Sequence, residues 1–276
     1  AASSSFSYLS QSALEQRKTV LDKIGAELIA RSSEIGEILA REEGKTLAEG
    51  IGEVARSGQF FQYYGAEALR LMGENTASVR PGVDVEVHRE PLGVIGIVTP
   101  WNFPMAVASW KVAPAIAYGN CVVLKPAELV PGSAWILADI ISRSGLPDGV
   151  FNVINGDKEA VDLLITDPAV DSVSFVGSTP VAEYIYHTSS KHNKRVQSLG
   201  GAKNHMVVMP DADLDQGVDG LIGAGDGSAG ERCMALSVAV AVGDVGDKLI
   251  EKLTPRVQNL KVGPGTDPEV EMGPLI

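Results

Sequence analysis

Between residues 93 and 189, short apolar runs alternate regularly with helical patterns, and this feature restricts the possible folds more than any other. The apolar runs suit buried strands, and the segments between them carry helical spacings. Such alternation predicts βαβ units on a parallel sheet whose faces are covered by helices, which is an α/β fold. We expect strands at residues 93–98, 121–125, 150–154 and 172–176, and helices at residues 105–118, 133–144, 158–166 and 181–189.

The segments on either side of this region have patterns of their own. Apolar spacings predict one helix from Leu14 to a stop at Gly44, and a second over residues 47–72. In residues 83–90, valines alternate with polar residues, which is typical of a half-exposed strand that could pair with a partner chain. After Arg195 we expect strands at residues 196–199, 206–209 and 237–242, and helices at residues 213–224 and 247–260.

The change of pattern suggests two domains, residues 1–200 and residues 201–276. A chain of 276 residues is long enough for two domains. The second would hold only about 75 residues, which is few for a mixed α/β domain. We therefore expect this chain to be part of a longer protein.

Composition excludes several classes of function. The net charge is −12, which disfavours a nucleic-acid partner because phosphates need clustered Lys and Arg. The two cysteines are too few for a disulfide framework, which predicts a reducing compartment: the cytoplasm, or the mitochondrial matrix in a eukaryote. No apolar run reaches the ~18 residues of a membrane span, and the first residues lack the pattern of a signal peptide, so we expect no membrane partner.

Cys233 is the strongest candidate for a catalytic residue. It follows a loop that contains Gly225, Gly227 and Gly230, and it precedes a strand-like run. A cysteine on a flexible loop at the mouth of a sheet can reach a bound carbonyl, and Arg232 would favour the reactive thiolate. The alternative is a small buried apolar residue beside a turn.

Asn102 is the second candidate. It lies in the turn Pro100-Trp101-Asn102-Phe103-Pro104, directly after the first predicted strand of the alternating region. Two prolines make this turn rigid, and an amide held firmly in place can donate to a developing oxyanion. The alternative is an asparagine that only caps the next helix.

Two further segments that follow strands suit a nucleotide. Lys125 can approach a ribose hydroxyl or a phosphate, and Glu128 can accept from ribose hydroxyls; the alternative is a surface ion pair. Ser178 follows Gly177 where a strand enters a helix, so free N–H groups and a hydroxyl could bind a phosphate. The alternative is an ordinary helix cap, with Pro180 in the first turn.

Several familiar motifs are absent. There is no Gly-x-Gly-x-x-Gly dinucleotide fingerprint, and no Gly-x-Ser-x-Gly motif of a serine hydrolase. The four histidines have no ligand spacing and there is no Cys-x-x-Cys, so we expect no metal site.

Five motifs in this order resemble the aldehyde dehydrogenase superfamily, over residues 11–276. They are residues 100–104, Lys-Pro-Ala-Glu at 125–128, Phe-Val-Gly-Ser at 175–178, Leu-Gly-Gly-Ala-Lys-Asn at 199–204, and the late Cys233. The resemblance implies that residues 1–200 are a variant Rossmann domain that binds NAD(P), and that residues 201–276 begin a catalytic domain. It also implies a homo-oligomer, a dimer or tetramer, with residues 83–90 as an oligomerisation strand.

The same resemblance implies roles for individual residues. Cys233 would attack an aldehyde, Asn102 would stabilise the oxyanion, and a hydride would pass to the nicotinamide. The residues that it implies in cofactor binding are Trp101, Lys125, Glu128, Gly156, Gly177, Ser178 and Leu199.

One departure from the family pattern bears on the product. Hydrolytic members usually carry a glutamate before Leu-Gly-Gly, where this chain has Ser198, and serine is no general base at neutral pH without help. Residues 183–185, 194–197, 202–205 and 231–237 resemble CoA-acylating methylmalonate-semialdehyde dehydrogenases. In that group two arginines hold a substrate carboxylate, which implies this role for Arg232 and Arg56. The alternative for Arg56 is a solvated helix arginine, and residues 37–110 are more similar to hydrolytic semialdehyde dehydrogenases.

The predicted function is NAD-dependent oxidation of malonate or methylmalonate semialdehyde through a cysteine thioester, which coenzyme A resolves to an acyl-CoA. One alternative is a hydrolytic NAD(P)-dependent semialdehyde dehydrogenase that gives a free acid. The other is a non-catalytic fragment or binding module on the same fold.

Overall fold

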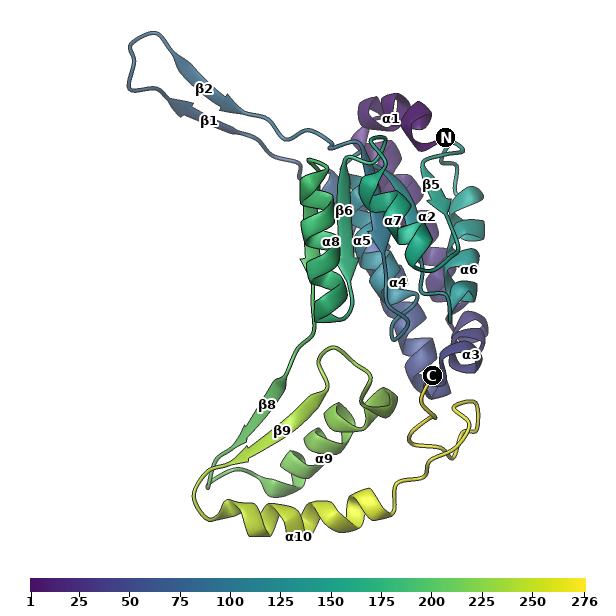
Figure 1. Cartoon of the computed structure of the whole chain (residues 1–276), viewed down its shortest axis with the longest axis vertical. Helices are drawn as coiled ribbons and strands as arrows, with labels where there is room; N and C mark the ends of the chain where they lie inside the picture. The colour runs from purple at the N-terminus through teal and green to yellow at the C-terminus, as the bar shows by residue number, and fades with distance from the viewer.

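A five-stranded parallel sheet forms the centre of the computed structural model, which describes residues 1–276 (Figure 1). The strand order is β5-β4-β3-β6-β7, and every neighbouring pair is parallel. Their bounds are β3 Val94–Val98, β4 Cys121–Lys125, β5 Phe151–Val153, β6 Ser172–Val176 and β7 Arg195–Leu199. The predicted α/β sheet with flanking helices is therefore confirmed.

Helices cover both faces of this sheet. Helices α7 (Lys158–Thr166) and α8 (Thr179–Lys191) pack on one face. On the other face lie α5 (Ala106–Ala117) and α6 (Pro131–Ser142), and α2, α3 and α4 pack outside them. The main hydrophobic core joins these layers, with side chains such as Ile97, Leu124 and Phe61 fully buried.

The strand order reverses at β3. The chain runs from β3 to β4 and β5 on one side, and then crosses back to β6 and β7 on the other side of β3. In open parallel sheets, ligands bind in the crevice beyond the carboxyl ends of the strands at such a reversal. The topology therefore points to the loops that follow β3 and β6 as the place for a site.

A second, smaller unit follows β7. It consists of two parallel strands, β8 (Asn204–Val208) and β9 (Leu236–Ala241), with helices α9 (Leu214–Gly225) and α10 (Val245–Gln258). Its separate hydrophobic cluster is built on Val208, Val218, Val245 and Leu249. The last residues then return to the first unit, where the Leu47 N–H donates to the Gly265 carbonyl over 2.7 Å (Figure 1).

An antiparallel hairpin extends from the body of the molecule (Figure 1). Its strands are β1 (Glu74–Ala77) and β2 (Asp84–Val87), and both are exposed along their whole length. The sequence predicted the second strand within residues 83–90 but missed the first, because Glu74–Ala77 carries no apolar alternation.

None of the helices combines the length and apolar character needed to cross a membrane.

The N-terminal helices differ from the prediction. The single helix expected from Leu14 to Gly44 is two helices, α2 (Leu14–Ala30) and α3 (Ser32–Glu43), preceded by α1 (Ala2–Gln11). The break falls at Arg31, whose backbone leaves the helical region at φ −101 and ψ 14. Its guanidinium bonds Glu27 behind it and Glu34 ahead of it, which holds the two helices at this junction. Gly44 does end α3, with a left-handed φ of 104.

Candidate active site

The carboxyl edge of the sheet carries most of the residues that the sequence singled out. Trp101 and Asn102 follow β3, Lys125 ends β4, and Glu128 comes soon after it. Gly156 follows β5, Gly177 and Ser178 follow β6, and Leu199 ends β7. One edge of one sheet thus gathers residues that are up to about 100 positions apart in sequence, as expected for parallel strands.

The turn that carries Asn102 contacts the loop that carries Cys233. The Asn102 side-chain amide donates to the Glu231 carbonyl over 2.6 Å, two residues before Cys233. An amide nitrogen has two hydrogens, so one N–H remains for a ligand. The structure therefore brings the two predicted catalytic residues to one place.

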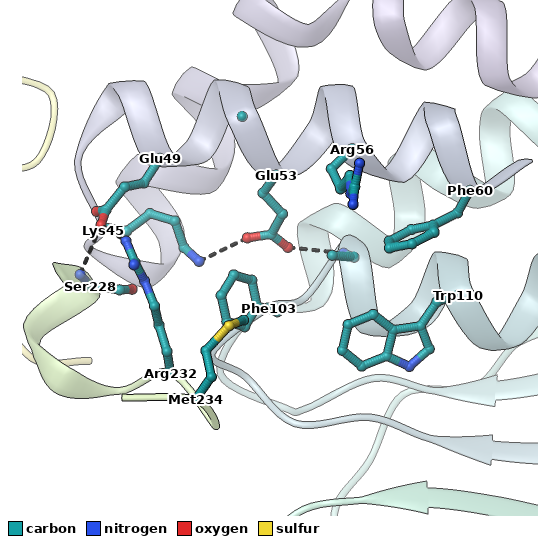
Figure 2. A pocket seen from close by; sticks show the side chains of 12 residues that line it. Lys45, Glu49, Glu53, Arg56, Phe60, Phe103, Trp110, Ser228, Arg232 and Met234 are labelled. Carbon is teal, nitrogen blue, oxygen red and sulfur yellow. Dashed lines mark hydrogen bonds and ion pairs between the residues drawn. The ribbon is translucent and has the colours of Figure 1, made fainter. Parts of the chain in front are cut away.

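A buried ion pair lies beneath this turn (Figure 2). The ammonium of Lys45 lies 2.8 Å from a carboxylate oxygen of Glu53 and also donates to the Asn102 carbonyl over 2.8 Å. The other Glu53 oxygen accepts from the N–H groups of Met105 and Ala106 over 2.9 and 3.0 Å, at the start of α5. The pair thus connects helix α4 (Leu47–Ala68) to the middle of the turn and to the first residues after it, which holds the Asn102 backbone in place.

Neither member of this pair was expected from the sequence. Both side chains are almost completely buried, and buried charges persist only when they are paired and hydrogen-bonded. Glu53 lies in a helical pattern where a glutamate is usually solvated, so no sequence signal marks it. Glu43 completes the cluster at 3.6 Å from the Lys45 ammonium, and burial raises its pKa to about 7.

Cys233 lies between a short helical turn and strand β9. The turn η1 covers Gly227–Gly230, and Cys233 is exposed. The Asn204 side chain donates to the carbonyls of Cys233 and Ala235 over 2.9 and 3.1 Å, which fixes the chain after the loop. No pattern in the sequence predicted this role for Asn204.

A cavity of ≈ 620 Å³ opens beside Cys233. Its lining includes, among the predicted residues, Trp101, Asn102, Gly177, Ser178 and Cys233. The structure therefore brings together both proposed catalytic residues and part of the proposed cofactor site in one hollow.

Figure 2 shows a second cavity, of ≈ 420 Å³. Arg56 and Arg232 both line it, so the two predicted substrate residues face the same cavity from different sides. Phe103, Trp110 and Arg232 line both cavities, so the two hollows share these side chains as walls. Further apolar walls come from Phe60, Ala106 and Met234.

Both arginines have partners within the chain. Arg232 forms an ion pair with Glu49, and its other terminal nitrogen donates to the Gly223 carbonyl over 3.3 Å. Arg56 donates to the Gln59 side chain over 2.9 Å and lies 5.6 Å from the Phe60 ring centre. Arg232 was expected to favour a Cys233 thiolate, but its guanidinium is turned toward Glu49 instead.

The expected nucleotide residues fit a dinucleotide at the sheet edge. Ser178 caps α8 without using its hydroxyl, which leaves that hydroxyl and the first N–H groups of the helix for a phosphate. A Cβ at Gly177 would lie 2.4 Å from the Phe175 ring, so only glycine permits this close turn. Lys125 lies 3.1 Å from Glu128, whose side chain is 56 % exposed. Its own backbone N–H and then Lys125 lower the pKa of Glu128, which keeps it an acceptor.

Some predicted residues lie outside the two cavities. Lys125, Glu128 and Gly156 line neither of them, although they occupy the same sheet edge. Leu199 lines a different hollow, together with Lys111 on α5. Burial lowers the pKa of Lys111 to about 8, and its ammonium donates to Ser174 and Gln197.

Ser198 does not line the cavity beside Cys233. Its hydroxyl donates to the Ala182 carbonyl on α8 over 2.7 Å. Among the residues that line the Cys233 cavity, the only carboxylate is Glu231, and burial raises its pKa.

The structure contains no group of three or more His, Cys, Asp or Glu side chains that could hold a metal ion.

Comparison with known proteins gives a consistent result. The aldehyde dehydrogenase family model matches residues 1–276. A malonate-semialdehyde dehydrogenase from Pseudomonas aeruginosa is 48% identical over 262 residues, which are 95% of this chain and 53% of that protein. One from Geobacillus thermodenitrificans is 43% identical over the whole chain and 57% of its own length. The chain thus spans about half the length of the curated relatives it matches.

Two solved structures agree closely in fold. The methylmalonate-semialdehyde dehydrogenase from Oceanimonas doudoroffii has a TM-score of 0.96 and 48% identity, over 100% of this chain and 57% of that chain. A structure from Sinorhizobium meliloti 1021, described as a methylmalonate-semialdehyde dehydrogenase complexed with NAD, has a TM-score of 0.96 and 44% identity. It covers 99% of this chain and 56% of that chain.

Proposed function

This chain belongs to the aldehyde dehydrogenase family, and from that premise we propose that the protein oxidises a carboxylated semialdehyde with NAD. Malonate or methylmalonate semialdehyde is the proposed substrate. The observation that carries the proposal is the pair of adjoining cavities. One contains the exposed Cys233, and the other contains the two arginines between apolar walls.

The chemistry proposed for Cys233 is covalent. Its thiolate attacks the aldehyde carbon, and the carbonyl oxygen becomes an oxyanion. The free N–H of the Asn102 amide donates to that oxyanion, and a fixed donor of this kind is a strong source of transition-state stabilisation. Loss of a hydride leaves an acyl thioester on Cys233.

The carboxylate end of the substrate is assigned to the arginine cavity. A guanidinium presents N–H groups in a planar fork that matches a carboxylate. The apolar walls between Arg232 and Arg56 suit the short carbon chain of a semialdehyde. The small volume of this cavity and its two guanidinium groups favour a small carboxylated aldehyde over a long or neutral one.

NAD is the proposed cofactor, and when bound it would accept the hydride. Support comes from the fit at the sheet edge and from the NAD-bound Sinorhizobium relative. Ser178 and the first N–H groups of α8 are proposed to hold a phosphate, and Lys125 and Glu128 a ribose. Trp101, Gly156, Gly177 and Leu199 are proposed to shape the rest of this site.

Coenzyme A is the proposed acceptor of the acyl group. Water attack needs a base within hydrogen-bond reach, directly or through one water. The Ser198 hydroxyl is a poor base and donates to α8, whereas the thiolate of coenzyme A needs no such help. Exchange of one thioester for another is also nearly thermoneutral.

The hydrolytic alternative has one observation in its favour. Glu231 lines the Cys233 cavity, and the rise of its pKa by burial makes it a better base near neutral pH. Release of a free acid through Glu231 is therefore the second candidate.

One experiment separates the two candidates. Steady-state NADH formation by the full-length protein is measured with and without coenzyme A, and the product is identified. The acylating proposal predicts a burst of NADH, then slow turnover that coenzyme A accelerates, with an acyl-CoA as product. Fast turnover to a free acid, indifferent to coenzyme A and lost in Glu231→Gln, would instead support hydrolysis.

The remaining assignments concern organisation. We propose that residues 1–200 form the NAD-binding domain and that residues 201–276 belong to the catalytic domain, which the separate hydrophobic cluster of the smaller unit supports. We also propose a homo-oligomer, dimer or tetramer, joined through the exposed β1–β2 hairpin. A cytoplasmic location, or the mitochondrial matrix in a eukaryote, stays a prediction.

A further inference from the structure

A single carboxylate, that of Glu49, joins the start of helix α4 to the loop that carries Cys233 (Figure 2). One oxygen accepts from the Thr46 N–H and the Thr46 hydroxyl, both over 3.0 Å, as part of a capping box. The other oxygen accepts from the Ser228 N–H over 2.9 Å and from the Arg232 guanidinium. Glu49 therefore contacts both the backbone of the loop and the arginine proposed to bind substrate.

The loop adopts a backbone that needs such a contact. Ser228 and Ala229 have φ values of 50 and 52, in the left-handed region that residues other than glycine rarely adopt. Ser228 is buried, so its N–H would otherwise lack an acceptor. The Glu49 carboxylate stabilises this conformation five residues before Cys233.

The guanidinium of Arg232 is held in the same way. A Cβ at Gly227 would lie 2.8 Å from the central carbon of the Arg232 guanidinium, so this group packs directly on the loop backbone. With Glu49 on one terminal nitrogen and the Gly223 carbonyl near the other, Arg232 has little freedom to turn.

Glu49 also binds the Arg232 guanidinium, which is the group that a substrate carboxylate would need. The arginine cavity is lined by three cations, Lys45, Arg56 and Arg232, and by two carboxylates, Glu49 and Glu53. Since Glu53 is fully engaged with Lys45 and the start of α5, Glu49 is the carboxylate that shares Arg232 with an incoming anion. A substrate carboxylate at Arg232 would meet a like charge.

We propose that Glu49 is a specificity-determining residue that holds Arg232 and the Ser228 loop in place, and that competes with the substrate carboxylate for Arg232. This inference rests on the proposed function, because it presumes that Arg232 binds a carboxylate. Glu49 thereby limits the affinity for carboxylated substrates while it orders the loop before Cys233.

Glu49→Gln and Glu49→Ala in the full-length protein separate these two effects. Glutamine retains an acceptor for the Ser228 N–H but removes the charge. We expect Glu49→Gln to raise the ratio of kcat/KM for malonate semialdehyde over propanal by about threefold to tenfold, through KM. Glu49→Ala also removes the acceptor, so its kcat is expected to fall with both aldehydes. A ratio that is unchanged or lower in Glu49→Gln overturns the competition, and equal kcat values for the two variants overturn the role in the loop.

Alkylation of Cys233 provides a test that needs no aldehyde. Iodoacetate carries a carboxylate and iodoacetamide does not, so the ratio of their rates reports the anion affinity of the site. Glu49→Gln is expected to raise this ratio, and the gain is expected to disappear in the Arg232→Leu background because no guanidinium remains to be released. A gain that persists without Arg232 would show a general charge effect and overturn the proposal.

Thr46→Ala is the matched control, since it weakens the same capping box but leaves the second Glu49 oxygen in place. It is expected to lower the melting temperature without raising either ratio. Failure of the proposed function has a different signature. In that case Arg232→Leu would affect malonate semialdehyde and propanal equally, whatever the alkylation ratios are.

Discussion

At the scale of single residues, the charges beneath the Asn102 turn have the largest consequences. Lys45 is the only cation near Glu53 and Glu43 that the structure pairs with them, and all three are buried. Removal of one member of a buried pair leaves an uncompensated charge, which is far more destabilising than loss of a surface pair.

Lys45→Met tests this directly. We expect it to lower the free energy of unfolding by about 3–5 kcal/mol, because the buried Glu53 carboxylate loses its cation. The control is Arg41→Met, which breaks an exposed pair with Glu37 and is expected to cost less than about 1 kcal/mol. Urea unfolding of both variants gives the comparison, and similar losses would contradict the account.

Glu43 predicts a dependence of stability on pH. Its pKa is about 7 in the folded protein, against 4.5 as the ordinary value, so the folded state keeps a proton that the unfolded state releases. The stability associated with this proton is fully present below about pH 4.5 and is lost as pH rises through about 7. Glu43→Gln is expected to flatten the decline between these values in urea unfolding. An identical pH profile for the two proteins would contradict the raised pKa.

At the scale of elements, helix α4 owes its close packing to glycines. A Cβ at Gly58 would lie 2.6 Å from the Gly25 carbonyl of α2, and a Cβ at Gly50 would lie 2.5 Å from the Gly36 carbonyl of α3. The backbones of the three helices are therefore in direct contact. This packing fixes α4, which carries Glu49, Glu53 and Arg56 to the site.

Two substitutions on this helix are expected to have opposite signs. Gly58→Ala forces α2 and α4 apart, and overpacking of this kind costs about 1–3 kcal/mol. Gly52→Ala on the same helix has nothing within 4 Å, so alanine is expected to stabilise by about 0.5–1 kcal/mol through its better helix propensity. Thermal unfolding measures both, and a loss at Gly52 equal to that at Gly58 would refute the contact argument.

The sequence predicted the bounds of an element well where a residue that breaks helices or strands follows its apolar pattern directly. Strand β4, helix α7 and strand β6 have the expected bounds, because glycine, proline or aspartate ends each pattern. The break at Arg31 was missed, since the apolar spacing continues across it. Strand β1 was missed because a fully exposed strand has no buried face to mark it.

At the scale of the whole molecule, the sequence could name candidate residues but not their partners. Motifs after strands pointed to the carboxyl edge of the sheet, and topology explains why Asn102 and Ser178 meet there. The contact of Arg232 with Glu49 joins residues 183 positions apart, which no sequence pattern links. The Lys45–Glu53 pair depends on burial that the neighbouring sequence does not mark. The Thr46-x-x-Glu49 capping box was readable from the sequence, yet it shows only one of the two functions that the Glu49 carboxylate serves.

We propose that Cys233 carries the acyl group after hydride transfer. The most direct measurement is mass spectrometry of the full-length protein, mixed with NAD and malonate semialdehyde without coenzyme A and then digested. We expect one acyl group on the peptide that contains Cys233, removal of that group by coenzyme A, and neither adduct nor NADH burst in Cys233→Ala. Rapid NADH formation by Cys233→Ala, or an adduct on another residue, would contradict the account.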